Sequence, residues 1–117
     1  MKFLCLVSFE PQTLAALSPA EKTTLDRNSL AYNDELTRNH HYITAEALQP
    51  VGSARTVRVR HGKASITDGP FAETKEHVGG FILIEAADMN QALEIAAGIP
   101  LAKLGSIEVR PIMKITV

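Results

Sequence analysis

Two segments that are apolar on both faces of a strand constrain the fold more than any other feature. They are Lys2 to Phe9 and Gly80 to Ala86. Strands in the middle of a buried sheet form nearly continuous apolar runs, whereas strands with one solvated face alternate. The segments His41 to Gln49 and Ser106 to Met113 have the character of edge strands. The sequence therefore predicts a sheet with two central and two edge strands.

Two helix-start signals lie between these strands. Ser18-Pro19-Ala20-Glu21 combines a capping Ser, a Pro in the first turn and a capping-box Glu. It predicts a helix that ends near Asn39, with Pro11 to Leu17 as a connection before it. The apolar stripe of this helix is formed by Leu25, Ser29, Tyr32 and Leu36. A second capping box at 88–91 predicts a helix that stops at Gly98.

A hairpin completes the pattern. Thr56 to Arg60 and Ala64 to Thr67 flank a His61-Gly62 turn. The order is then β-α-β, hairpin, β-α-β, which predicts an α+β, ferredoxin-like split βαβ fold with an inserted β-hairpin. A chain of 117 residues fits one domain, residues 1–117.

The predicted sheet has one uncovered face. Two helices cover only one side of a four-stranded sheet, and burial of a Leu or Ile side chain is worth about 1.5–3 kcal/mol. Several such side chains left on a flat sheet favour association. We therefore expect a homodimer, sheet face to sheet face, in which two sheets enclose a shared core as a dimeric α+β barrel.

Charge and cysteine content exclude several classes of function. The net charge is −1, which argues against direct nucleic-acid or membrane binding, and the basic hairpin is interpreted as a solvated face. The single Cys5 excludes an internal disulfide and a multi-cysteine metal site. The four histidines have no metal-ligand spacing. We expect no metal, no cofactor and a cytoplasmic location; the apolar N-terminal run is too short to span a membrane.

The segment Asp68-Gly69-Pro70-Phe71-Ala72-Glu73-Thr74-Lys75-Glu76 holds the main candidate for chemistry. Asp68 follows a strand and precedes a Gly-Pro turn. Its carboxylate can hold the turn through backbone N–H groups, or act as a general base aimed into a cavity. Both interpretations stay open at this point.

Other candidate pocket residues have a structural alternative as well. Glu73 and Lys75 fit either a solvated charge run or a pocket mouth, and Phe71 fits a hydrophobic plug that anchors the loop. His77 fits a site next to Asp68 or an ordinary strand start. Glu46 and Arg110 lie on edge strands, and an Arg110–carboxylate pair is the default expectation for charges near an apolar core.

The motif resembles the signature of the DGPF-type branch of YCII-related proteins. The likeness extends to Glu46 to Pro50, Gly79 to Phe81 and Ile107 to Met113, so it covers nearly the whole chain. It implies a dimeric α+β barrel and a small bacterial protein of a family mostly of unknown function. It also implies a link to extracytoplasmic-function sigma factors and a candidate His–Asp dyad. The segment Ser18 to Leu25, where that His is expected, contains no His.

Two functional hypotheses follow. In the first, the chain is a small metal-independent enzyme that uses Asp68 as acid/base on an organic ligand, aided by Glu46, Glu73 or Arg110. In the second, it is a non-catalytic dimer that binds a ligand or partner, linked to sigma-factor-dependent transcription. The missing histidine favours the second.

Overall fold

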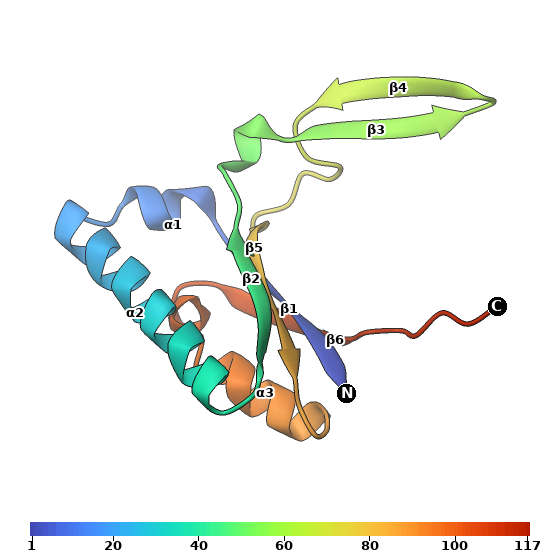
Figure 1. The fold of residues 1–117 in the computed structure, drawn as a ribbon. Coiled ribbons are helices and arrows are strands. Elements are labelled where there is room, and N and C mark those ends of the chain that lie inside the picture. The colour runs from blue at the N-terminus through green and yellow to red at the C-terminus, as the bar shows by residue number, and fades with distance from the viewer.

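The computed structural model describes all residues, 1–117, as an α+β fold with a projecting hairpin (Figure 1). In chain order the elements are β1 (Lys2–Phe9), α1 (Pro11–Ala15), α2 (Pro19–Arg38), β2 (Tyr42–Ala47), the 3-10 turn η1 (Val51–Ser53), β3 (Arg55–Arg60), β4 (Lys63–Asp68), β5 (His77–Glu85), α3 (Met89–Ala97), the 3-10 turn η2 (Pro100–Lys103) and β6 (Ser106–Pro111).

Four strands form one antiparallel sheet in the order β2-β5-β1-β6. The two strands that are apolar on both faces are central, as predicted, and the other two lie at the edges. This is the connectivity of a split βαβ fold. β3 and β4 form a separate two-stranded sheet.

The predicted capping box starts α2. The Ser18 hydroxyl accepts from the Glu21 backbone N–H at 3.1 Å, and the Ser18 N–H donates to Glu21 Oε1 at 2.9 Å. The expected connection before it was partly wrong, since Pro11–Ala15 forms the short helix α1. Pro11 stands at the first helical turn, where its fixed φ favours the helix and its missing N–H costs nothing.

The core lies between the sheet and its helices, which cover one face of it (Figure 1). Alternate residues of the central strands point into it, and α2, α3 and the segments after β5 and α3 close it. Its buried residues are Phe3, Cys5, Val7, Leu36, Ile82, Ile84, Ala86, Ala92, Ile95, Ala96 and Ile99.

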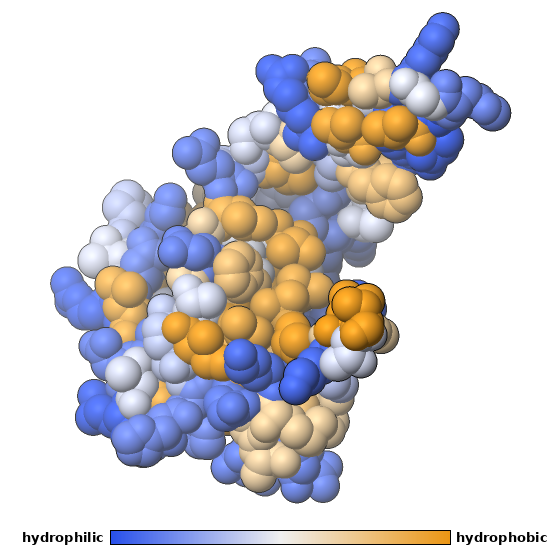
Figure 2. Space-filling view, turned by 45° about the vertical axis from the view of Figure 1, so that its right-hand side comes forward, coloured by the Kyte–Doolittle hydropathy of each residue, from blue (hydrophilic) through white to orange (hydrophobic).

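The other face of the sheet is uncovered. Strand register places Leu4 opposite Leu83 and Leu6 opposite Phe81, so these four partly exposed apolar side chains share this face. Apolar residues gather on it, below the hairpin, in the view of Figure 2. We call these four residues the open face.

Two extensions leave the compact body. The hairpin projects from one end of the sheet and residues 112–117 run off β6, both away from the helices (Figure 1). The radius of gyration is 16.2 Å, whereas a compact domain of this length has about 13 Å. Only 12 of 117 residues are buried, so one copy of the chain leaves much of its apolar surface in contact with water.

Candidate functional site

A cavity of about 610 Å³ lies between α1, α2 and the sheet, on the helix-covered side. Its walls are mainly aliphatic and aromatic, with Val7 and Phe9 from β1, Leu25 and Tyr32 from α2, and Leu101 from η2. The volume falls within the about 300–1,000 Å³ of small-molecule sites, which are mostly apolar with a few polar groups. The cavity is the larger of the two main concave regions of the chain.

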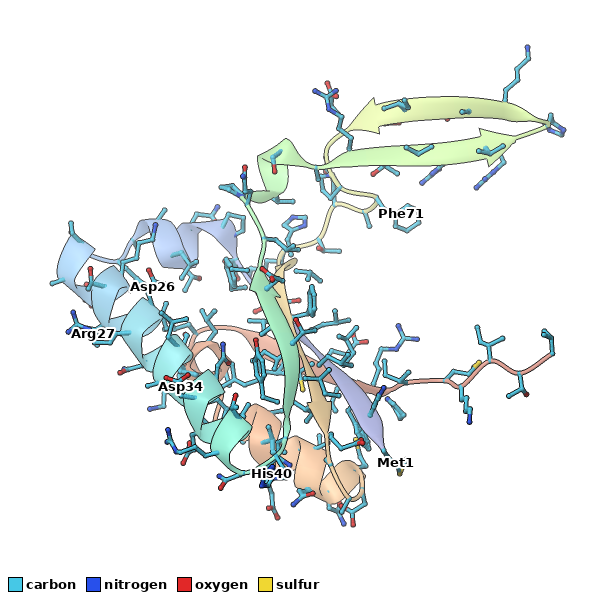
Figure 3. All side chains as sticks on the ribbon, in the orientation of Figure 1. Met1, Asp26, Arg27, Asp34, His40 and Phe71 are labelled. Carbon is cyan, nitrogen blue, oxygen red and sulfur yellow. The ribbon has the colours of Figure 1, made fainter.

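Most of the polar residues that line the cavity come from one helix, and Glu46 of β2 is the further charged residue of the lining. Asp26, Ser29 and Asn33 of α2 line it, and their spacing of three and four residues places them on one helix face. Figure 3 shows Asp26 on the side of α2 nearer the sheet and Arg27 on the outer side. A carboxylate, a hydroxyl and an amide along one wall can hydrogen-bond the polar end of an otherwise apolar ligand.

Sequence reasoning found only part of this wall. It placed Ser29 in the helix stripe that packs on the sheet, but it did not single out Asp26 or Asn33. Ser29 was the available signal, because a polar residue inside an apolar stripe needs a partner or a cavity, whereas Asp26 and Asn33 lie beside the stripe and gave no such signal.

Tyr32 fixes the position of the α2 wall. Its hydroxyl donates to the Ile95 carbonyl at 2.6 Å, which ties α2 to α3. Burial, with a smaller contribution from Glu35, raises the pKa of the Tyr32 hydroxyl, so it stays a donor at neutral pH. A Cβ on Gly98 would lie 2.4 Å from the Tyr32 hydroxyl oxygen, so glycine permits this close approach.

The Gly-Gly pair of β5 shapes the opposite wall. A Cβ on Gly79 would lie 2.3 Å from the Phe9 ring, and one on Gly80 would lie 2.9 Å from the Glu46 carbonyl oxygen. Both glycines line the cavity. The pair therefore lets Phe9 and the β2 backbone come close to β5 at the cavity.

The motif at residues 68–76 borders a second, smaller groove of about 490 Å³. Phe71, Thr74, Glu76 and His77 line it together with Ser8. The Ser106 hydroxyl donates to Glu76 Oε1 at 2.8 Å, and Thr74 Oγ1 donates to the Glu76 carbonyl. Glu76 is thus the acid of the motif that holds the loop against the sheet, and Leu48 belongs to both concave regions.

Asp68 lies outside both concave regions. Its side chain is 86% exposed and accepts from Arg55 Nη1 at 2.7 Å. The next residue, Gly69, has a φ of +92° and donates its N–H to the Ala54 carbonyl at 2.7 Å. These two contacts close the root of the hairpin. The Asp68 carboxylate thus pairs with a side chain, and not with the backbone N–H groups that the turn-holding interpretation expected.

The other motif residues face outward. Phe71 is 74% exposed and lies 4.9 Å from the Arg58 guanidinium, as a cation–π pair. It projects from the loop beneath the hairpin (Figure 3), so in one copy of the chain it is not a buried plug. Lys75 Nζ lies 3.6 Å from Glu10 Oε1, and Glu73 is exposed.

Glu46 and Arg110 lie at opposite edges of the sheet. Glu46 is paired with Phe81 and Arg110 with Leu4, so by register both belong to the open face; Glu46 also contributes to the cavity wall. Arg110 Nε lies 3.7 Å from Glu108 Oε2, the expected Arg–carboxylate pair, but both side chains are solvent-exposed.

The single thiol has the properties of a core residue. Cys5 is fully buried, and desolvation raises its pKa to about 11. A thiol that stays protonated at neutral pH is a poor nucleophile. The structure brings no three His, Cys, Asp or Glu side chains together as a metal site. No helix has both the length and the apolarity needed to cross a membrane.

Comparison with known proteins identifies relatives of this chain. The model of the YCII-related domain family matches residues 1–116. An uncharacterized protein of Rhizobium meliloti (strain 1021) is 45% identical over 67 residues, which is 56% of this chain and 54% of that protein. The aligned region thus spans about half the length of this relative.

Proposed function

We propose, from the premise that this chain belongs to the YCII-related domain family, that it is a dimeric binding protein for a small, largely apolar organic molecule. The ligand occupies the cavity between α2 and the sheet. Its polar end meets Asp26, Ser29 and Asn33 on α2. The observation that carries the proposal is the cavity itself, in which 13 of 20 lining residues are hydrophobic and three polar residues lie on one helix face.

The position of Asp68 weighs against acid/base catalysis by that residue. A general base must lie within hydrogen-bond reach of the proton it removes. Asp68 is exposed, paired with Arg55 and absent from the walls of both concave regions. The binding hypothesis therefore fits the geometry better than the enzyme hypothesis does.

The open face supports the dimer. It is apolar at its centre and carries charge at both edges, with Glu46 on β2 and the Glu108–Arg110 pair on β6. A second copy, turned about an axis parallel to the strands, sets β2 of one sheet across from β6 of the other. The Glu46 edge of each copy then meets an edge that carries both Arg110 and Glu108, and the main gain comes from burial of the four central apolar residues.

The ligand proposal can be tested with indole, which is apolar, flat and carries one N–H donor. At ten times its Kd, indole should stabilise the protein by about 1.4 kcal/mol and raise the Tm by several degrees. Ser29→Phe, which fills the cavity, should abolish that shift. Asn28→Phe adds the same ring at an exposed neighbour and should keep it. An equal indole shift in both variants would place the ligand elsewhere.

The dimer proposal has an independent test. Sedimentation velocity at micromolar concentration should give twice the chain mass of 12.7 kDa. A single species of 12.7 kDa would reject the dimer and leave the cavity proposal standing. The link to an extracytoplasmic-function sigma factor and the placement in the DGPF-type branch stay predictions.

A further inference from the structure

The β3–β4 hairpin has two chemically different faces. Register pairs Val57 with Ile66 and Val59 with Ala64, so these four residues share one face, which we call the apolar arm face. Arg58 is paired with Ser65 and Arg60 with Lys63 on the other face. Val57, Val59 and Ile66 are 60%, 59% and 68% exposed. An alternating pattern of this kind is typical of a sheet with one buried face.

The hairpin has no partner within its own chain that can bury this face. Both strands are exposed almost throughout, and the hairpin stands clear of the sheet and helices in Figure 1. An isolated two-stranded hairpin is at best marginally stable in water, and gains stability from further strands or from packing on another surface. The hairpin nevertheless has a complete strand register, so we expect a surface outside the protomer to stabilise it.

The distribution of charge favours a second copy of this chain as the surface on which the hairpin packs. Residues 55–68 carry four basic side chains and one acidic side chain, a net charge of +3. The whole chain has a net charge of −1, so the remaining residues carry −4. The basic side chains Arg58, Arg60 and Lys63 lie on the face opposite the apolar arm face. The opposite net charges of arm and body therefore favour the approach of one copy's arm to another copy's body, while the contact itself is apolar.

The direction in which the β3–β4 hairpin projects also agrees with a second copy as its partner. The hairpin and residues 112–117 both extend away from the helices, on the side of the sheet that the helices leave uncovered (Figure 1). A second copy seated on the open face would lie between these extensions. The arm is thus continuous with the proposed dimer interface.

We infer that the β3–β4 hairpin is a dimerisation arm, whose apolar face packs on the body of a second copy of this chain. The inference rests on the proposed dimer and adds a second contact region to it. The root of the arm is fixed by the Asp68–Arg55 pair and by the Gly69–Ala54 hydrogen bond. The motif at 68–76 then has a structural purpose, because it sets the direction in which the arm leaves the sheet.

A photo-crosslinking experiment tests the contact directly. Benzoylphenylalanine at position 66, on the apolar arm face, should give a covalent dimer on irradiation. The same group at position 65, on the opposite face of the same strand, should give little or none. A wild-type dimer in which neither position crosslinks would overturn the arm while leaving the dimer intact. A monomeric wild type would reject both.

The dissociation constant of the dimer provides the second measurement. Ile66→Ser removes one apolar contact in each copy and should raise the Kd of the dimer at least about 100-fold. Ser65→Ala is the matched control and should leave the Kd unchanged. Equal Kd values for wild type and Ile66→Ser would contradict the inference.

A duplex DNA probe separates this role from nucleic-acid binding. We expect no saturable binding of a 20-base-pair duplex at 150 mM salt. Salt-sensitive binding that is lost in an Arg58→Gln, Arg60→Gln variant, with an unchanged dimer Kd in Ile66→Ser, would assign the arm to nucleic acid and overturn the inference.

Discussion

Individual residues of this chain divide between closing the core and shaping the cavity. Gly98 allows the Tyr32 hydroxyl to reach Ile95, and Gly79 makes room for the Phe9 ring. Cys5 fills the centre of the core beneath the helices and is fully buried. Substitutions of these residues should therefore alter side-chain packing more than they alter chemical reactivity.

The thiol of Cys5 predicts a specific pH dependence. Its pKa is raised from about 9 to about 11 by burial, so the protonated form is favoured in the folded state. The resulting stability of about 2 to 3 kcal/mol is complete below pH 9 and is lost as the pH rises toward 11. Urea unfolding of wild type and Cys5→Ala across this range should show the difference between the two proteins shrinking. If the free energies of unfolding of the two proteins kept a constant difference across this pH range, the raised pKa of Cys5 would be contradicted.

At the scale of elements, the motif loop and the hairpin root form one unit. Arg55 and Asp68 close the hairpin, Glu76 holds the loop to Ser106, and Lys75 lies beside Glu10. Each of these contacts is close to solvent, so each contributes modestly to stability. Together they decide how the arm is attached to the sheet.

The Asp68→Asn substitution distinguishes a structural role of Asp68 at the hairpin root from a catalytic or ligand-binding role. The substitution removes one exposed ion pair and should lower the free energy of unfolding by less than about 1 kcal/mol. Indole binding, measured by thermal shift, should be unchanged because Asp68 does not line the cavity. Loss of indole binding in a folded Asp68→Asn protein would return this residue to the ligand site.

The helices and strands also show how much of the structure the sequence alone predicts. Apolar runs on both faces identified β1 and β5 as central strands, because this signal is local. A capping box located the start of α2; at α3 the Asp88 cap forms, but Gln91 Oε1 accepts from the Ala87 N–H, so the predicted box is only half present. The site was harder to predict. Asp26 and Asn33 face a cavity only because α2 stands over the Gly79-Gly80 segment, and such long-range placement leaves no local pattern.

At the scale of the whole molecule, one copy of the chain leaves two apolar surfaces exposed to water. The open face and the apolar arm face are uncovered, and the radius of gyration of 16.2 Å exceeds the value for a compact domain. The proposed second copy would cover both surfaces. The cavity lies between the sheet and α2 and shares Phe81 with the open face, so in the proposed dimer the ligand site is formed within one protomer and borders the interface at Phe81.

The most direct test of the central claim is an NMR titration of the ¹⁵N-labelled protein with indole. We predict saturable shifts of backbone amides that cluster at the cavity, at Ser29, Asn33, Gly79 and Gly80. Shifts that cluster instead on residues 69–76 would assign ligand binding to the motif groove, and would contradict the proposal that the cavity beneath α2 is the functional site.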